Sequence, residues 1–152
     1  EIINKSNMKS IKLFVLLLSI LIVSCESEAE NPEMVITIGT TCGWCAGTDF
    51  LVITKNNMTY TLAAICDRSE KIINKSTPDS IWQKLNGLYD QSKFKKINIK
   101  TCNVCVDGCD TWIRVQNGDF NHEIRFGSTQ DIALASISEF VEKLNYLKNE
   151  YK

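Results

Sequence analysis

Two Cys-x-x-Cys pairs are the part of this sequence best suited to chemistry. They are Cys42-Gly43-Trp44-Cys45 and Cys102-Asn103-Val104-Cys105, and three further cysteines stand at positions 25, 66 and 109. Cysteines at this spacing can exchange disulfides as a thiol oxidoreductase, supply half of a tetrahedral metal site, or take part in structural disulfides. The elements around the pairs and the compartment of the protein bear on the choice between these hypotheses.

An oxidoreductase acting through Cys42 and Cys45 needs a helix directly after the pair. The N-terminus of such a helix lowers the pKa of the first thiol and makes it a nucleophile. The segment that follows here, Ala46 to Ile53, has the pattern of a β-strand instead. A thiol-disulfide oxidoreductase is therefore kept as an alternative and is not the favoured hypothesis.

A zinc or copper site is the second alternative. The two pairs together offer four thiolates, which is the tetrahedral set that zinc prefers. A gap of 56 residues between Cys45 and Cys102 is longer than in a compact zinc ribbon, and two other cysteines would be left over. In an oxidising compartment the thiolates also compete with disulfide formation. The candidate ligands are Cys42, Cys45, Cys102 and Cys105.

The N-terminal segment indicates the compartment. A basic stretch at Lys9 precedes an apolar run of 11 residues, Leu13 to Val23, which ends at a small residue. This order is typical of a secretory signal peptide, and the run is shorter than the about 20 residues that span a bilayer. We expect residues 1–24 to be the signal peptide, with residues 1–7 upstream of the true start.

The end of this segment, Ile22-Val23-Ser24-Cys25, resembles the lipobox of bacterial lipoproteins. The resemblance implies cleavage before Cys25 and attachment of acyl chains such as palmitate through its sulfur. Each buried CH₂ contributes about 0.8 kcal/mol, so lipidated Cys25 would anchor the chain to a membrane surface. We expect residues 25–33 to be the lipidated cysteine with an acidic tether, and residues 34–152 to be a single globular α+β domain.

The tether and the charge bear on location and partners. The acidic tether resembles the surface-export signal of some Gram-negative lipoproteins and fits a plain spacer equally well. We expect a lipid-anchored protein of the cell envelope, at the outer membrane, facing either the periplasm or the outside. From Cys25 onward the chain carries 14 basic and 17 acidic residues, a net charge of −3, without a basic stripe that would suit nucleic acid. The expected partners are the membrane, through the anchor, and an unidentified protein or small-molecule ligand.

The rest of the chain has the pattern of an antiparallel α+β domain. Two hairpins are predicted, with two-residue loops at Asn56-Asn57 and Asn117-Gly118. Helices are predicted from Thr77-Pro78 and from about Gln130. Together with a strand at Met34 to Ile38, these elements predict an antiparallel sheet of about five strands with two helices packed on one face.

The hairpins also assign side chains to faces. The first loop would place Ile53 opposite Tyr60, and the second would place Val115 opposite Phe120 on an apolar face. His122 falls on that apolar face, so we interpret it as a core histidine rather than a catalytic base. Trp112 falls on the polar face and, like Trp44, is a candidate for a surface contact. No catalytic residue and no cofactor are predicted.

Disulfides are the favoured role of the cysteines. An even number remains after Cys25, and exported proteins rarely keep free thiols. Extending the first hairpin places Cys66 opposite Gly47, close to Cys45, so Cys45–Cys66 is the pairing to test first. The disulfide candidates are Cys42, Cys45, Cys66, Cys102, Cys105 and Cys109.

The folded part also resembles small uncharacterised envelope lipoproteins. Two short elements carry this resemblance, Gly43-Trp44-Cys45-Ala46-Gly47 and the segment Cys102 to Gly108, within a match from about Val35 to Leu147. The resemblance implies the fold and assigns no activity. Because Cys42 and Cys109 are additional to its pattern, it is compatible with a bond between them, and a bond from Cys42 to the Cys102 group stays open.

The hypothesis that accounts for most of these features is a membrane-anchored envelope lipoprotein of unknown specific activity. It would act as a non-catalytic binding or structural module, held together by disulfides. The oxidoreductase and the metal-binding protein are the alternatives.

Overall fold

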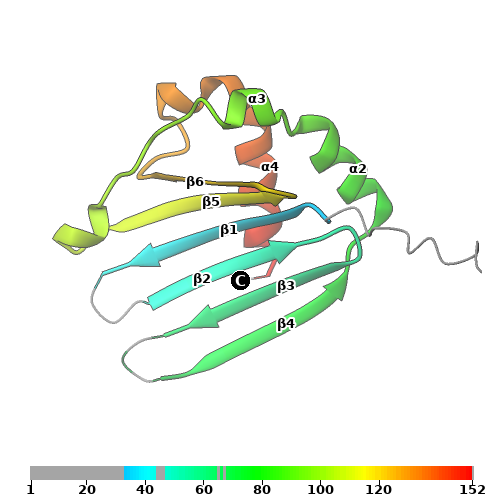
Figure 1. Ribbon diagram of the computed structural model, residues 1–152. Helices are drawn as coiled ribbons and strands as arrows, with labels where there is room; N and C mark the ends of the chain where they lie inside the picture. The colour runs from blue at the N-terminus through cyan, green and yellow to red at the C-terminus, as the bar shows by residue number, and fades with distance from the viewer. Residues whose placement is uncertain (1–32, 44–46, 65, 67, 152) are drawn as a thin grey trace, which may run out of the picture. The chain divides into compact units, whose positions relative to one another are not determined.

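The computed structural model describes residues 33–43, 47–64, 66 and 68–151 (Figure 1). In this part of the chain six strands form one antiparallel sheet in the order β4-β3-β2-β1-β5-β6. The first four strands follow one another as a meander, and β5 returns to pair with β1. The strands are β1 (Val35–Cys42), β2 (Gly47–Ile53), β3 (Asn57–Ala63), β4 (Glu70–Ser76), β5 (Cys109–Asn117) and β6 (Phe120–Phe126).

Helices pack on one side of this sheet, where Figure 1 shows α4 crossing behind the strands. We call this side the helical face and the other side the open face. Strand side chains alternate between the two, and those of Ile36, Leu51 and Ile113 on the helical face are fully buried. The helices are α2 (Asp79–Leu88), α3 (Gln91–Phe94), η1 (Asn103–Val106), η2 (Ile132–Ile137) and α4 (Ser138–Asn149), of which η1 and η2 are 3₁₀ helices.

The fold class is as predicted, but the described residues contain six strands rather than five. The additional strand is β4, which forms an edge of the sheet and is exposed along most of its length. Its sequence, Glu-Lys-Ile-Ile-Asn-Lys-Ser, has no clear alternation, because only Ile73 points to the core. Charged residues on an edge strand discourage pairing with other chains, and Lys71 and Lys75 fit that role.

The turn of the first hairpin lies one residue earlier than predicted. Thr54 and Asn57 close the loop, with the Thr54 amide donating to the Asn57 carbonyl at 2.8 Å, so the two loop residues are Lys55 and Asn56. The Thr54 hydroxyl also accepts from the Asn57 amide at 3.0 Å, which favours this closure. As a result Ile53 pairs with Met58 instead of Tyr60.

The turn of the second hairpin lies one residue later than predicted. Asn117 pairs with Phe120, and Val115 pairs with His122 instead of Phe120. Gly118 is the first residue of the loop and has a φ of 59°. Glycine with positive φ at the first of two loop positions fits a type II′ hairpin turn. In both hairpins the observed pairing differs from the predicted pairing by two residues. Every side chain therefore keeps its predicted face.

Both predicted helices exist, but their starts differ from the prediction. The Thr77 hydroxyl caps no amide of α2 and donates to the Thr54 carbonyl at 2.9 Å, which ties the start of the helix to the first hairpin. The last helix begins as 3₁₀ helix η2, and α4 follows from Ser138. Leu134 and Ile137 are the buried residues of η2. Within the described residues no helix is long and apolar enough to cross a membrane.

Candidate functional site

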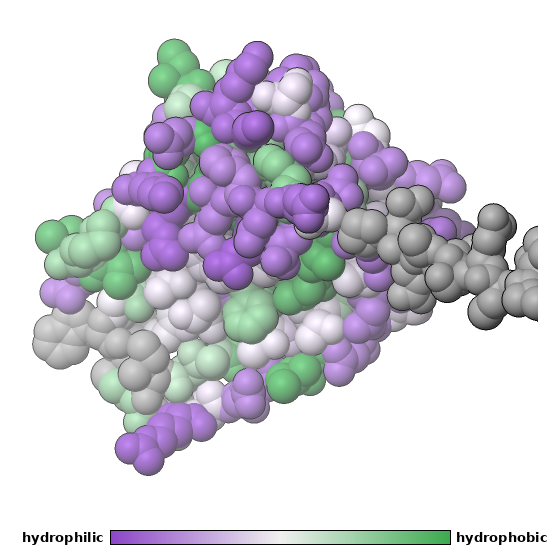
Figure 2. Space-filling model, in the orientation of Figure 1, coloured by the Kyte–Doolittle hydropathy of each residue, from purple (hydrophilic) through white to green (hydrophobic). Residues whose placement is uncertain are grey.

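The open face is the first of two candidate sites. Figure 2 shows it as a weakly polar to apolar area between hydrophilic borders. Threonines and apolar side chains of the central strands alternate onto this face, which no helix among the described residues covers (Figure 1). Its half-buried apolar members include Val35, Phe50, Val52 and Trp112. A surface of this kind is suited to contact with another molecule.

Trp112 lies flat at the centre of the open face because of Gly39. These residues are opposite each other in β5 and β1, and Phe50 is opposite Gly39 on the other side. A Cβ atom on Gly39 would lie 2.3 Å from Cζ2 of the indole, so only glycine leaves room for the ring. The indole therefore covers the backbone of β1 with one side and turns its other side outward.

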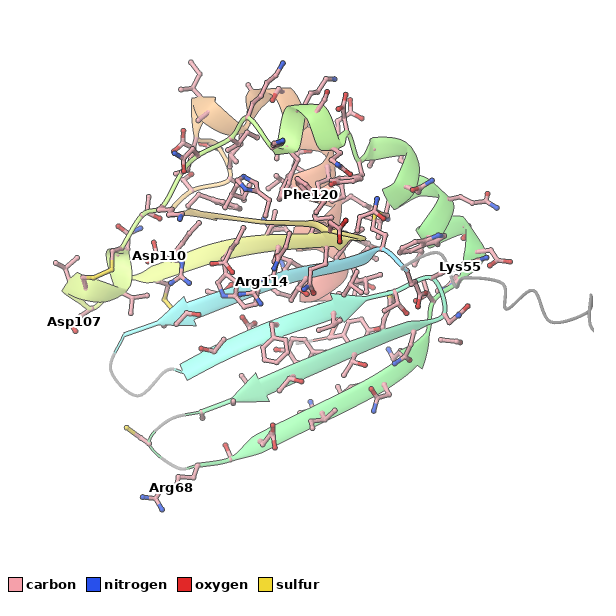
Figure 3. The ribbon with its side chains drawn as sticks, viewed as in Figure 1. Lys55, Arg68, Asp107, Asp110, Arg114 and Phe120 are labelled. Atoms are coloured by element: carbon pink, nitrogen blue, oxygen red, sulfur yellow. A yellow bond between two sulfur atoms is a disulfide. The ribbon has the colours of Figure 1, made fainter. Side chains whose placement is uncertain are left out.

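Polar contacts fix the indole in this position. Its Nε1 donates to the Thr41 hydroxyl at 3.1 Å, and the Phe50 ring lies 6.3 Å away between centroids. On the other side the Arg114 guanidinium lies 5.7 Å from the Trp112 ring, within cation–π range. Arg114 in turn pairs with Glu123 of β6 at 2.6 Å, on the face turned toward the viewer in Figure 3.

A pocket on the helical face is the second candidate site, and we call it the inner pocket. It has a volume of about 290 Å³ and lies where β1 ends at Cys42 and β2 begins at Gly47. The side chains that give the pocket its chemistry are Thr40, Asp49, Tyr60, Leu62, Lys71 and Tyr151.

A buried ion pair stands beside the inner pocket. The Lys148 ammonium of α4 donates to Asp49 Oδ1 at 3.1 Å and also to the Thr40 hydroxyl. Lys148 is 2% exposed and Asp49 is 7% exposed, so both charges are removed from water and compensate each other. The Tyr60 hydroxyl donates to Asp49 Oδ2 at 3.4 Å.

Two tyrosine rings form one wall of the inner pocket. Tyr60 and Tyr151 stack with centroids 5.8 Å apart. Burial raises the pKa of Tyr151, and burial together with the Asp49 carboxylate raises the pKa of Tyr60, so both phenols stay protonated at neutral pH. The buried Tyr151 hydroxyl has no hydrogen-bond partner among the described residues.

Sequence reasoning missed the inner pocket, although two signals pointed to it. Asp49 is the single charged residue in the alternating segment Gly47 to Ile53, on the same face as Leu51. Lys148 lies four residues after Leu144 and so falls on the predicted apolar stripe of the last helix. A charged residue at each of two inward positions, with opposite signs, is the pattern of a buried pair.

The cysteines in the described residues are disulfide-bonded. Cys42 and Cys109, which are opposite each other, form a bond between the end of β1 and the start of β5, one of the two possibilities left open for Cys42. Cys102 and Cys105 bond to each other within the segment that contains η1. Cys66 is also disulfide-bonded.

Several predicted residues lie outside the described part of the chain. These are Cys25, Trp44 and Cys45, so the lipidation site, one surface tryptophan and the Cys45–Cys66 pairing stay predictions. The pairing of β2 with β3 does place Thr48 opposite Ala63, and a Cβ on Gly47 would lie 2.1 Å from the Ala63 carbonyl. The predicted position of Cys66 opposite Gly47 is therefore wrong, because the first hairpin is shifted by two residues.

The predicted metal ligands are not gathered as a set in the described residues. Three of them, Cys42, Cys102 and Cys105, are held in disulfides, and the last two bond to each other. Among the described residues no group of three or more His, Cys, Asp or Glu side chains could hold a metal ion.

His122 has the surroundings of a core histidine. Its Nε2 lies 2.8 Å from the Ile97 carbonyl, which accepts the proton of that nitrogen, and its ring packs edge-on against Phe94. Phe120 packs against its other side. The ring is thereby used in packing, as the alternation of the second hairpin predicted.

Asp110 is a buried acid near the start of β5. It is fully buried beneath the segment around η1 and accepts from the Thr101 hydroxyl at 2.7 Å and the Val104 amide at 3.2 Å (Figure 3). Burial alone raises the pKa of this carboxyl, but the hydrogen bonds and the nearby Arg125 lower it below its usual value. Asp110 therefore holds the segment Thr101–Val104 onto the start of β5.

Comparison with known proteins assigns no family or function to this chain. The sequence matches no protein-family model and no curated protein. The functional proposals therefore rest on the open face, the inner pocket, the cysteines and the N-terminal sequence.

Proposed function

We propose that this protein is a lipid-anchored module of the cell envelope that binds a partner without catalysing a reaction. The observation that carries the proposal is the open face, where Trp112 lies flat on Gly39 beside Phe50. A fixed aromatic ring offers a large contact area at a small cost in side-chain entropy, because it is already ordered before a partner arrives.

The borders of the open face support a specific contact. Arg114 and Glu123 are partly exposed beside the indole and offer charges of both signs at the edge of an apolar centre. Binding surfaces of proteins often have this arrangement, an apolar centre with a polar rim. The open face would thus contact an unidentified protein or another ligand in the envelope.

The state of the cysteines supports a structural role for them. Each described cysteine is already in a disulfide, and Cys42 is bonded to Cys109 of a neighbouring strand. A thiol oxidoreductase acting through Cys42 and Cys45 would join these two sulfurs to each other when oxidised, and a thiolate metal site needs its sulfurs in reduced form. No structural observation favours either alternative, so neither is put forward as a second candidate.

Lipidation at Cys25 supplies the membrane partner in this proposal. The signal-like segment and the lipobox resemblance support an anchor at this residue, and the tether that follows would separate the domain from the outer membrane. Cys25→Ser should move the protein from the membrane fraction to the soluble fraction. Ser24→Ala keeps both a small residue and the cysteine, so it should stay with the membrane. A Cys25→Ser protein that remains on membranes would refute the anchor.

Site-specific photo-crosslinking in cells tests the open face. A photo-reactive amino acid at Val52, which lies on the open face, should give light-dependent adducts, whereas the same group at the exposed Lys84 of α2 should not. Trp112→Ala should reduce the adducts formed from position 52. Equal adducts from both positions, or adducts insensitive to Trp112→Ala, would contradict the proposal.

Mass spectrometry with alkylation distinguishes structural disulfides from an oxidoreductase or a metal site. The purified protein should take up no alkyl groups before reduction and should contain no bound zinc. A readily reduced Cys42, or four alkylatable thiols together with zinc, would instead support the oxidoreductase or the metal site.

A further inference from the structure

The inner pocket has the features of a small-molecule site. Its volume of about 290 Å³ is near the lower end of the range for ligand pockets. At about 30 Å³ for each water-sized group, it holds a compound of about ten non-hydrogen atoms. Its walls combine the apolar Leu62 and the stacked rings of Tyr60 and Tyr151 with a few polar groups.

Tyr151 contributes its ring to the pocket. The side chain is 6% exposed and lines the pocket, but its hydroxyl is buried and has no hydrogen-bond partner among the described residues. Because this hydroxyl has almost no accessible surface, a ligand in the pocket would contact the ring and not the hydroxyl.

The charges around the pocket define the kind of ligand. The Asp49 carboxylate is compensated by the Lys148 ammonium at 3.1 Å, so the pair adds little net charge. Lys71 lines the pocket from the edge strand β4 and has no ion-pair partner among the described residues. Lys75 of the same strand lies over the Tyr151 ring at 4.6 Å. The uncompensated charge at the rim is therefore positive.

We propose that the inner pocket binds a small organic carboxylate. Its carboxylate would pair with Lys71 at the rim, and its apolar body would lie against Leu62 and the stacked rings of Tyr60 and Tyr151. This deepens the proposed binding function by naming a site and a ligand class. It involves neither Cys25 nor the open face, so its failure can be distinguished from failure of the anchored-module proposal.

Paired probes test the charge requirement. Three carboxylates of suitable size, 4-hydroxybenzoate, 3-phenylpropionate and hexanoate, are each titrated at pH 7 into the purified full-length protein alongside the matching uncharged amide. Binding is followed by ligand-observed NMR and calorimetry. At least one carboxylate should bind saturably, and about tenfold more tightly than its amide. Failure of all three to bind, or equal binding of acid and amide, would overturn the proposal.

Two variants with matched controls test the assigned contacts. Lys71→Gln should weaken carboxylate binding about tenfold and abolish the preference over the amide. Lys55→Gln removes the same charge at the opposite end of the sheet, where Figure 3 shows Lys55, and should leave binding unchanged. Unchanged binding in Lys71→Gln, or an equal loss in both variants, would count against the site.

Tyr151→Leu removes the ring, and Tyr151→Phe removes only the hydroxyl. Because the ligand would contact the ring and not the buried hydroxyl, Tyr151→Leu should weaken binding of 3-phenylpropionate several-fold and Tyr151→Phe, the control, should not. Equal affinity of Tyr151→Leu and the unmodified protein would exclude the proposed contact with this ring.

Discussion

The two faces of the sheet each carry an acid–base pair, and the pairs differ in their surroundings. On the helical face Asp49 and Lys148 lie 3.1 Å apart with side chains 8% and 3% exposed. On the open face Glu123 and Arg114 lie 2.6 Å apart, but their side chains are 29% and 47% exposed. The closer contact therefore belongs to the pair that water screens.

Burial, more than distance, decides what each pair does for stability. The free energy of an exposed pair is small because water and salt weaken the attraction. A buried pair costs much to form, since both charges leave water, and it is costly to break because one charge is then left behind. The helical face is thus sensitive to single substitutions, whereas the open face can vary its charges and so adapt to a partner.

The largest difference between the faces is expected from Asp49→Ala. This substitution leaves the Lys148 ammonium buried without the carboxylate that faces it, so it should lower the free energy of unfolding by about 3–5 kcal/mol. Urea denaturation followed by circular dichroism measures this loss. The double variant Asp49→Leu with Lys148→Met removes both charges and should regain much of the stability. A loss below about 1 kcal/mol would mean that the buried pair behaves like an exposed one.

Gly39→Ala is expected to have the next largest effect, this time on the open face. The new Cβ would collide with the Trp112 indole, and such overpacking typically lowers stability by about 1–3 kcal/mol. The tryptophan emission should shift as the ring moves toward water. Gly87→Ala in α2 is the matched control. No atom lies within 4 Å of its added Cβ, so it should raise stability by about 0.5–1 kcal/mol. An unshifted emission in Gly39→Ala would contradict the flat packing of Trp112.

Asp110 adds a pH dependence to the open side of the sheet. Its pKa is lowered in the folded protein, so the unfolded chain takes up the proton first as the pH falls. The stabilisation by this carboxylate is therefore complete well above pH 4, about the value for an unfolded aspartate, and is lost as the pH falls further. Asp110→Asn should be less stable than the unmodified protein at pH 7, and the difference in stability should shrink as the pH falls below about 4. Parallel stability curves between pH 7 and pH 2 would contradict this.

The smallest effect is expected from Arg114→Ala. The exposed pair with Glu123 should contribute less than about 1 kcal/mol to the free energy of unfolding, and still less in high salt. Thermal unfolding in low and high salt measures it. A loss as large as that of Asp49→Ala would remove the proposed contrast between the faces.

The faces of the strands could be predicted from the sequence, but the pairing of the strands could not. Alternation of apolar and polar residues in the segment 111–126 assigned Ile113 and Trp112 to their correct sides. The turns were placed at asparagines because asparagine tolerates a positive φ. Local hydrogen bonds of Thr54 and the positive φ of Gly118 decide the loops instead. The alternation of residues shows which face a side chain takes. It does not show the strand pairing, because a shift of the pairing by two residues leaves every side chain on the same face.

The two inward charges beside the inner pocket can each be seen in the sequence, but their pairing depends on contacts distant in sequence. Asp49 and Lys148 are 99 residues apart, and only the packing of α4 on β2 brings them together. Strand β4 was missed for a related reason. As an exposed edge it needs little apolar alternation, so its sequence resembles that of a loop.

The bond between Cys42 and Cys109 has a consequence for a protein that encounters proteases. β1 and β5 are neighbours in the sheet, but 67 residues separate the two bonded cysteines along the chain. A single cut anywhere in that stretch, including the exposed strand β4, yields two fragments that stay joined through sulfur. The nicked protein would therefore migrate as one chain until a reductant is added, so cleavage of this domain need not release any part of it.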